Sequence, residues 1–513
     1  MRFIAKLLLI YFLLIFFTLI DIKGQIFVST DGNDNNSGTK EQPFKTITKA
    51  ISVAVPGDTI YVRGGIYSLT STISIGSSKS GTSEKMYYLF AYKNERPILD
   101  FSSMSFSGSN RGISLRANYW YIKGFDIKGA GDNGMEINGG SYNIIEFCSF
   151  YENRDSGLQL SNGASNNKII NCDSYNNLDP DDEGDADGFA PKLTVGNNNY
   201  FYGCRAWQNS DDGWDGYLRG ANDVTTILEN CWTFNNGYRK DGSTSKGNGN
   251  GFKMGGGDNS NSQNLMHHFV LKNCLAFNNK VKGFDQNNNA GSMTLLNCTG
   301  FGNKSANYRI TRQLNAGQSL IVKNCISLNG SVELGSFAIQ EKNSWLSPFK
   351  ISESDFLSID PSEAFAPRKS DGSLPDIKFM HLASNSQFID AGVDVGLHFN
   401  GTAPDLGAFE FNNATSIKIN ESISNDFQVF QNYPNPFNPS TIIKFNIPKN
   451  SNVKIKVYDL LGNLVAELLN SFLTAGTYSI VWKADDFNLN SGIYFIRIEC
   501  ERSAKTIKAM YLK

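Results

Sequence analysis

The stretch that decides the fold is Cys204-Arg205-Ala206-Trp207-Gln208-Asn209-Ser210-Asp211-Asp212-Gly213-Trp214-Asp215. Its first half is one copy of a repeat, in which an aromatic residue follows a cysteine by three positions and an asparagine follows it by five. The copies begin at Cys148, Cys172, Cys204, Cys231, Cys274 and Cys298, the aromatics are Tyr151, Tyr175, Trp207, Phe234, Phe277 and Phe301, and the asparagines are Asn153, Asn177, Asn209, Asn236, Asn279 and Asn303. Spacings of 24 to 43 residues between successive cysteines are typical of a solenoid with insertions.

The three columns predict a parallel β-helix, an all-β fold in which equivalent residues of successive coils stack at the strand spacing. We expect the cysteines and aromatics to fill the core and the asparagines to hydrogen-bond one another in a ladder at a turn. Because the cysteines share one face, we expect free thiols rather than disulfides.

A further column follows the turn. Its members are Gly134-Met135-Glu136, Gly157-Leu158-Gln159, Gly188-Phe189-Ala190, Gly213-Trp214-Asp215, Gly251-Phe252-Lys253, Gly283-Phe284-Asp285 and Asn307-Tyr308-Arg309. Glycine and asparagine favour a left-handed corner, and the middle residue is expected to point inward. Strand alternation sends the third residue outward, which predicts one exposed row: Glu136, Gln159, Ala190, Asp215, Lys253, Asp285 and Arg309. Asp215 and Lys253 would then lie side by side.

The ends of the chain suggest export and a capped solenoid. Residues 1–24 have Arg2 and Lys6 before an apolar run, the pattern of a signal peptide. Residues 25–411 are assigned to the β-helix, with looser coils expected toward residue 410. Ile47, Ala50, Ile51 and Ala54 predict a short helix that covers the open end of the core.

The C-terminal part reads as a separate small β-sandwich. A polar linker is expected at 412–426, and short alternating strands within 427–513 predict the sandwich. Asn432-Tyr433-Pro434-Asn435-Pro436-Phe437-Asn438-Pro439 and Ser491-Gly492-Ile493-Tyr494 resemble the C-terminal sorting domain of type IX secretion. The resemblance implies the type IX secretion machinery as a partner, export through the periplasm, and a secreted or cell-surface protein.

Carboxylates gather beside the predicted row. Asp187 precedes Gly188, and one coil later Asp211 and Asp212 precede Gly213 while Asp215 follows it. Four converging carboxylates would repel one another unless a hard cation such as Ca²⁺ joined them. None of the four histidines falls in this stretch, and His267 and His268 are interpreted as structural, which disfavours a transition metal.

Lys253 has two readings. A cation in the cluster would lower the pKa of a neighbouring lysine and suit it to act as a general base. The alternative is a structural ion pair with Asp215.

At these residues the chain resembles the family 9 polysaccharide lyases, which are right-handed β-helix pectate lyases. The resemblance covers most of residues 26–410. It implies Asp187, Asp211, Asp212 and Asp215 as Ca²⁺ ligands and Lys253 as the catalytic base of a β-elimination on polygalacturonate or a related uronate polysaccharide. Pro191 departs from the expected small residue, and Lys282 and Arg309 are weaker candidates for substrate binding.

Two other functions stay open, a β-helix glycoside hydrolase with Asp211, Asp212 or Asp215 as acid and base, and a non-catalytic carbohydrate-binding surface protein. The net charge of −2, from 47 basic and 49 acidic residues, gives no sign of a nucleic-acid or membrane-surface protein. We expect a monomer.

Overall fold

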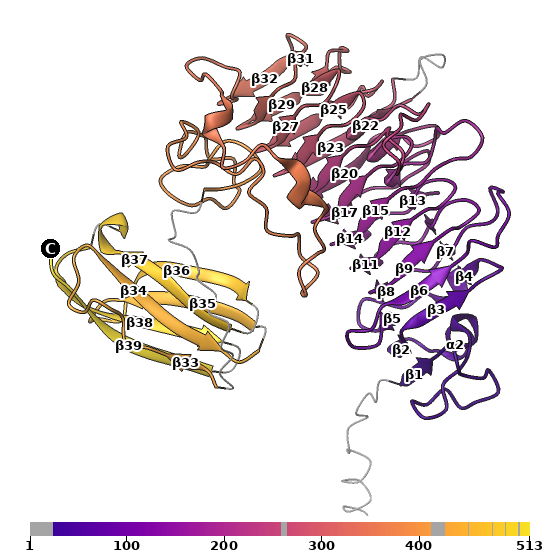
Figure 1. Cartoon of the computed structure of the whole chain (residues 1–513), viewed down its shortest axis with the longest axis horizontal. Helices are drawn as coiled ribbons and strands as arrows, with labels where there is room; N and C mark the ends of the chain where they lie inside the picture. Colours follow the sequence, from indigo (N-terminus) through magenta and orange to yellow (C-terminus); the bar gives the residue numbers. More distant parts are fainter. Residues whose placement is uncertain are drawn as a thin grey trace, which may run out of the picture. The chain divides into compact units, whose positions relative to one another are not determined.

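The computed structural model describes residues 24–257, 264–411 and 426–513, apart from 450, 474, 475, 488, 501 and 502. The predicted signal peptide and almost all of the predicted linker lie outside these residues. The chain divides into two compact units, which meet in the sequence between Glu410 and Phe411 (Figure 1). No helix of the described residues is long and apolar enough to cross a membrane.

The first unit is a parallel β-helix of three sheets, which confirms the predicted class. Each coil contributes one strand to sheet A, then one to sheet B, then one to sheet C. Sheet A has the strand order β1 (Gln25–Val28), β2 (Thr59–Val62), β5 (Tyr87–Ala91), β8 (Trp120–Lys123), β11 (Ile144–Glu146), β14 (Lys168–Ile170), β17 (Asn199–Tyr202), β20 (Val224–Glu229), β23 (His267–Lys272), β26 (Met293–Leu296), β29 (Leu320–Lys323) and β32 (Ala338–Glu341).

Sheet B carries the cysteine repeat. Its strands are β3 (Gly65–Ser68), β6 (Pro97–Asp100), β9 (Asp126–Lys128), β12 (Ser149–Tyr151), β15 (Asp173–Tyr175), β18 (Arg205–Trp207), β21 (Trp232–Phe234), β24 (Leu275–Phe277), β27 (Thr299–Phe301) and β30 (Ile326–Leu328). Sheet C carries the predicted row, on β4 (Ile73–Ile75), β7 (Ile113–Leu115), β10 (Met135–Asn138), β13 (Leu158–Ser161), β16 (Phe189–Pro191), β19 (Trp214–Tyr217), β22 (Phe252–Gly256), β25 (Lys282–Asp285), β28 (Ala306–Ile310) and β31 (Val332–Leu334).

The asparagine ladder forms as predicted. The Nδ2 of Asn177 donates to Oδ1 of Asn209 at 2.8 Å, and the same bond recurs from Asn209 to Asn236 at 2.9 Å. The ladder extends from Asn153 to Asn307, and every amide in it is buried. All eight cysteines are free and buried, in agreement with the stacked-thiol prediction.

The repeat's aromatics do not lie in the core, contrary to the prediction. Three positions along a strand lead to its opposite face, so the cysteines point inward and these rings point outward. They form a stack on the outside of sheet B, with centroids 4.3 Å apart between Tyr175 and Trp207 and 4.7 Å apart between Phe234 and Phe277.

The glycine column was also misinterpreted. None of Gly134, Gly157, Gly188, Gly213, Gly251 and Gly283 has positive φ. They are needed for close packing, because a Cβ on Gly213 would lie 2.0 Å from Oγ1 of Thr233. The left-handed corners lie elsewhere, directly before each cysteine and one residue after each aromatic, as at Asn171 and Asn176 with φ of 51° and 55°.

The apolar residues after these glycines do fill the core, and Trp214 is fully buried as predicted. The helix α2 (Ile47–Val53) also forms, with Ile47, Ala50 and Ile51 buried against the first coils. Its N-cap is Thr46, whose side chain accepts from the backbone N–H of Lys49.

Residues 342–410 do not continue the coils, contrary to the prediction. They contain the short 3₁₀ turns η3 (Glu353–Asp355) and η4 (Pro361–Phe365), and they fold back over the outer face of sheet B. The ring of Phe365 lies 4.9 Å from that of Phe234, and the ring of Phe379 lies 4.8 Å from that of Phe277. This covering segment therefore buries part of the aromatic stack.

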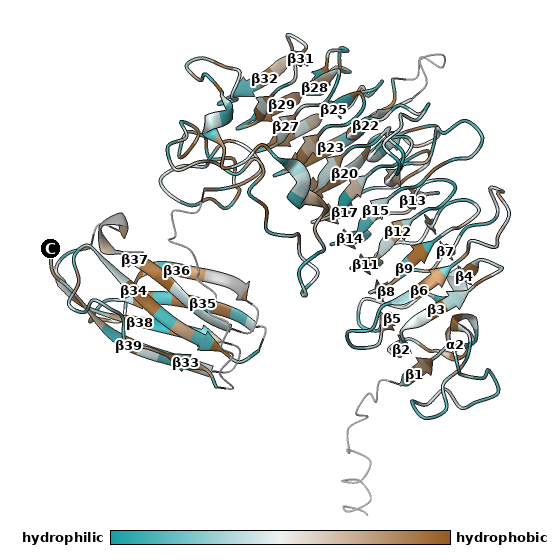
Figure 2. Cartoon of the chain, viewed as in Figure 1, coloured by the Kyte–Doolittle hydropathy of each residue, from teal (hydrophilic) through white to brown (hydrophobic). Residues whose placement is uncertain are grey.

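The second unit is the predicted β-sandwich. One sheet joins β33 (Gln428–Val429), β34 (Ser440–Ile447) and β37 (Gly476–Lys483), and the other joins β36 (Leu464–Leu473), β35 (Ser451–Tyr458), β38 (Gly492–Cys500) and β39 (Ser503–Tyr511). Strands predicted at 442–447, 453–458, 476–482 and 492–498 correspond to β34, β35, β37 and β38, whereas β33, β36 and β39 were not predicted. Strands such as β34 and β35 alternate hydrophobic and hydrophilic residues, as the packing of two sheets requires (Figure 2).

Candidate metal centre and its lysines

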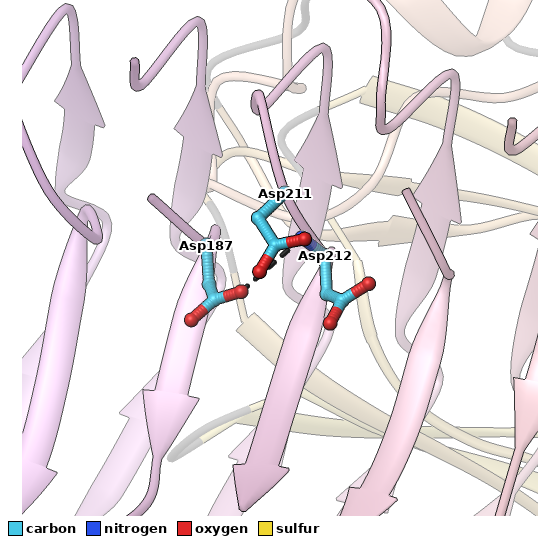
Figure 3. A group of neighbouring side chains, drawn as sticks. All are labelled: Asp187, Asp211 and Asp212. Atoms are coloured by element: carbon cyan, nitrogen blue, oxygen red, sulfur yellow. Dashed lines mark hydrogen bonds between the residues drawn. The ribbon is translucent and has the colours of Figure 1, made fainter. Parts of the chain in front are cut away.

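The turn from sheet B to sheet C brings Asp187 and Asp212 together. The residue before each glycine occupies the same place on successive coils, because the N–H of Gly188 donates to the carbonyl of Asp212 at 2.9 Å, and that of Gly213 to Asn250 at 2.9 Å. The side chains follow the same order. Oδ1 of Asp187 accepts from the backbone N–H of Asp212 at 3.2 Å (Figure 3).

Three of the predicted ligands form one group. Asp187, Asp211 and Asp212 are all buried, and each offers an oxygen that lies within 4.8 Å of the other two. Figure 3 shows Asp211 and Asp212 at the start of one strand and Asp187 on the neighbouring coil.

Asp215 lies beside this group and pairs with Lys253, as the register predicts. The two residues are partners in the pairing of β19 with β22, and Oδ1 of Asp215 lies 3.3 Å from Nζ of Lys253. Lys253 is closer still to Asp212, with Nζ 3.0 Å from Oδ2. The side chain of Lys253 is 11% exposed.

The rest of the predicted row is in register but largely buried, which corrects the prediction that it is exposed. Glu136, Gln159, Asp215 and Asp285 are all buried, and Arg309 is the exposed member. Neighbouring side chains cover the row, as where Oε1 of Glu136 accepts from Oγ of Ser161.

Two insertions lie against the centre, each at the turn from sheet B to sheet C of its own coil. On most coils the glycine follows the ladder asparagine by four positions, but by eleven after Asn177 and by fifteen after Asn236. An ion pair joins the two insertions, with Nη2 of Arg239 2.6 Å from Oε1 of Glu183. The second insertion also reaches Asp211, whose Oδ1 accepts from the backbone N–H of Asn248.

Electrostatics of the centre reflect its excess of carboxylates. Burial and the charge of Asp211 raise the pKa of Asp212 to about 8. Burial also raises the pKa of Asp187 well above its usual range, although Lys192 opposes that effect. For Lys253, burial lowers the pKa but Asp212 and Asp215 outweigh it, so the pKa lies well above the ordinary lysine value. These carboxylates therefore act on Lys253 in the direction opposite to that of a bound cation, whose charge would lower the pKa of this lysine.

The residues fit a hard divalent cation. Four carboxyl groups face two lysines, so full ionisation would leave two negative charges uncompensated, and the raised pKa values of Asp187 and Asp212 reflect that excess. Buried oxygens also remain available, since Oδ2 of Asp212 and Oδ1 of Asn250 accept no hydrogen bond from the described residues, although Lys253 lies near the former. An all-oxygen donor set of this kind suits Ca²⁺.

Lys192 was missed by the sequence analysis. Its Nζ lies 2.8 Å from Oδ2 of Asp187 and 3.9 Å from Oδ2 of Asp215, and the side chain is 5% exposed. Strand alternation was the available signal, because Lys192 follows Phe189 by three positions and so has the outward parity of the row.

The remaining predicted residues make their contacts outside the group of Asp187, Asp211 and Asp212. Lys282 is on β25, with Nζ 3.0 Å from Oδ1 of Asp285, and Arg309 on β28 pairs with Glu333 at 3.2 Å. His267 begins β23, where Nε2 contacts Oγ1 of Thr226 at 2.8 Å and burial lowers its pKa to about 4. A buried, uncharged histidine agrees with its structural interpretation.

Comparison with known proteins identifies the first unit. Residues 26–329 match the family described as Pel9A-like, right-handed β-helix region. The chain belongs to this family. The match adds the right hand of the helix and confirms the predicted relationship to the family 9 polysaccharide lyases and the predicted enzyme class.

The alignments with individual relatives cover most of each relative's length. Pectate lyase L of Dickeya chrysanthemi is 38% identical over 403 residues, 77% of this chain and 92% of its own. Pectate lyase L of Paenibacillus polymyxa is 39% identical over 396 residues, 73% and 84% respectively. The crystal structure of pectate lyase Pel9A superposes with a TM-score of 0.69 at 38% identity, over 76% of this chain and 97% of that one. A rhamnogalacturonan lyase gives a TM-score of 0.63 at 28% identity, over 70% and 97%.

Residues 431–512 match the secretion system C-terminal sorting domain. The second unit is therefore the predicted sorting domain, and the chain is marked for export.

Proposed function

We propose that this protein is a calcium-dependent pectate lyase, which cleaves polygalacturonate by β-elimination. The observation that carries the proposal is the buried group of Asp187, Asp211 and Asp212 with Asp215 and Lys253 beside it. Family membership and the full-length pectate lyase relatives support the substrate class.

Asp187, Asp211, Asp212 and Asp215 would hold the ion. Bound there, Ca²⁺ would supply Lewis-acid chemistry that makes the proton on C5 of a galacturonate unit more acidic. The same positive charge would offset the carboxylates that raise the pKa of Lys253.

Lys253 then removes the C5 proton at Nζ. The electron pair of the C5–H bond forms the C4–C5 double bond as the C4–O bond breaks, which leaves a 4,5-unsaturated end. The C4–O pair leaves with the glycosidic oxygen, which takes a proton from water and becomes the hydroxyl of the released chain. Lys192 is less suited to this role, because its side chain is less exposed and its Nζ also donates to the backbone carbonyl of Asp185 at 3.2 Å. Lys282 and Arg309, farther along sheet C, are proposed to bind carboxylates of neighbouring sugar units.

One assay tests the reaction class and the ion together. Ultraviolet absorbance of unsaturated products is followed on polygalacturonate, with calcium and with a chelator. We expect calcium-dependent absorbance from the parent and, in Asp211→Ala or Asp215→Ala, none at low calcium with partial recovery at high calcium. Saturated products without calcium dependence would favour a glycoside hydrolase, and binding without shortening of the polymer would favour a carbohydrate-binding protein.

The similarity to a rhamnogalacturonan lyase supports a second candidate substrate. The same assay on rhamnogalacturonan distinguishes the two, because the preferred polymer gives the faster rise in absorbance. For the route of export, we propose passage through the periplasm and delivery by the type IX machinery to the cell surface or the medium.

A further inference from the structure

Lys192 is the centre's second lysine, and its surroundings differ from those of Lys253. Lys253 contacts Asp212 and Asp215, whereas Lys192 makes its closest contact with Asp187, at 2.8 Å. Asp187 is the one member of the buried group that comes from the preceding coil. The carboxylates of the two coils can share one ion only if that of Asp187 is held close to those of Asp211 and Asp212.

Every oxygen of Asp187 has a defined partner. Oδ2 accepts from Nζ of Lys192 at 2.8 Å and lies 3.2 Å from Oγ of Ser156, whose hydroxyl also lies 2.9 Å from the carbonyl of Asp185. Oδ1 accepts from the N–H of Asp212 at 3.2 Å. Lys192 and Ser156 thereby turn Oδ2 away from the next coil and leave Oδ1 facing Asp212 and Asp211.

The backbone explains how Lys192 reaches this carboxylate. Pro191 ends β16, and a proline cannot donate to the next carbonyl of a strand ladder. The pairing of β16 with β19 is limited to Phe189 with Trp214, and the N–H of Lys192 donates to the carbonyl of Ala190 at 2.9 Å in a tight turn. The N–H of Lys192 also lies 3.3 Å from the carbonyl of Leu160 on the preceding coil, and Leu193 bridges Leu218 on the next coil. Pairing with the next coil is therefore interrupted only locally, between Phe189 and Leu193, at the edge of the carboxylate group.

We propose that Lys192 is a positioning residue, which orients Asp187 as a calcium ligand and so sets the calcium affinity of the centre. The inference rests on the proposed function and extends it to a residue outside the predicted ligand set and base. Residues that hold a metal ligand in place typically change metal affinity 10- to 100-fold when they are replaced.

The test is calorimetric titration of the full chain with Ca²⁺ after removal of metal by a chelator. We expect Lys192→Met to raise the dissociation constant for Ca²⁺ about 10- to 100-fold, since methionine keeps the length of the side chain but cannot donate to Asp187. The matched control is Arg111→Met, which removes a cation that pairs with Asp132 at 3.2 Å and with Glu136 at 2.9 Å, also beside sheet C. The control should leave the calcium constant within about twofold of the parent while it lowers the melting temperature.

The outcomes separate the inference from the proposed function. An unchanged or tighter constant in Lys192→Met overturns the positioning role. If Lys192→Met does not fold, Ser156→Ala decides, because it removes the other side-chain group within hydrogen-bond distance of Oδ2 of Asp187. A weaker calcium affinity in this variant supports orientation of the carboxylate by its neighbours, and an unchanged affinity overturns it. Failure of the parent to bind Ca²⁺, or a calcium affinity that is unchanged in Asp211→Ala, counts against the proposed metal centre itself.

Discussion

At the scale of single residues, the role of a side chain in this protein depends on neighbours from other coils. Lys253 lies 38 residues from Asp215 in the sequence and 3.3 Å from it in space. Lys192 and Lys253 both carry an ammonium group beside the same carboxylates, yet one is more exposed and the other is tied to Asp187 and to a backbone carbonyl. Position on the coil, more than residue type, distinguishes the proposed base Lys253 from the proposed positioning residue Lys192.

Replacing Lys253 tests its role directly. Lys253→Ala removes the base but none of the four carboxylates, so we expect Ca²⁺ to bind while turnover falls about 10²- to 10⁴-fold. Lys253→Arg keeps the charge, but a guanidinium deprotonates far less readily than an ammonium and should restore little activity. Turnover is measured at saturating calcium and raised pH.

The melting temperatures of the two variants provide the control. A purely structural Lys253 would give an arginine variant nearly as active as the parent and an alanine variant that is mainly less stable. Near-parental turnover in Lys253→Ala would rule out the mechanism proposed here.

At the scale of elements, the strands of sheet B have two distinct faces. The thiols lie inside, and the ring stack lies outside, where the covering segment packs on part of it. The amides form a third column at the turn, and those from Asn153 to Asn279 each donate to the asparagine of the next coil, because buried amides need hydrogen-bond partners.

The thiol column leads to a simple count. Titration of the denatured protein without reductant should find eight free thiols, the seven of sheet B and Cys500 of the sandwich. Because the stacked cysteines all lie on the same inner face, we expect no disulfide among them. A deficit of two thiols would reveal a disulfide and contradict the stack.

The covering segment is fastened by a buried ion group. Asp173 on β15 lies 2.9 Å from Arg205 and 2.7 Å from Arg368, and Nη1 of Arg205 donates to the carbonyl of Ala364 at 2.9 Å. Burial raises the pKa of Asp173, but the two arginines outweigh it and lower the pKa to about 2.

Acid should therefore loosen this contact. An aspartate in the unfolded chain has a pKa of about 3.9, so Asp173 contributes stability that is present above that value and is lost as the pH falls toward 2. We expect Asp173→Asn to cost about 3–5 kcal/mol of unfolding free energy at pH 7, since two buried guanidinium groups lose their partner. The difference between parent and variant should shrink as the pH is lowered from 4 to 2, as measured by thermal unfolding.

An exposed carboxylate serves for comparison. Glu152 pairs with Lys240 at 2.9 Å, with side chains 40% and 70% exposed. Glu152→Gln should change stability by less than about 1 kcal/mol at any of these pH values. Equal effects of the two substitutions would contradict the fastening role of Asp173.

At the scale of the whole molecule, the two units have separate cores. The buried residues of the β-helix form one cluster, and those of the sandwich, from Phe437 to Tyr511, form another. Each unit therefore has the packing it needs to fold without the other.

Deletion of residues 427–513 tests this independence together with the sorting role. The truncated protein should keep the lyase activity and the melting transition of the β-helix, and it should accumulate in the periplasm of its host. Activity in cell fractions and in the medium provides the measurement. Export of the truncated chain at the parental level would contradict the sorting role.

Much of this arrangement could be predicted from the sequence because a solenoid repeats its rules. The register that joins Asp215 to Lys253 follows from a column of glycines, and the ladder follows from a column of asparagines. Both depend on periodicity, which is visible without a structure.

What could not be predicted depends on contacts that have no period. The covering segment shows no repeat, so its return over sheet B could not be distinguished from further coils. The glycines at 188 and 213 are required by the closeness of neighbouring side chains rather than by their own backbone angles. Burial of the row was missed because side-chain contacts such as that of Glu136 with Ser161 follow no period, and Lys192 was missed because it lies two positions beyond the column residue Ala190.

The two insertions over the metal centre have a consequence for how such chains can diverge. Both enter at the same turn, between a ladder asparagine and the following glycine, and they flank the coil that carries Asp211. A change in length there would alter the surface beside the proposed metal centre but leave the stacking of thiols, amides and rings in register. Segments of the chain that tolerate insertion are thereby distinct from those that must keep their length. A change of substrate range would then need only the exchange of two loops on an unchanged β-helix.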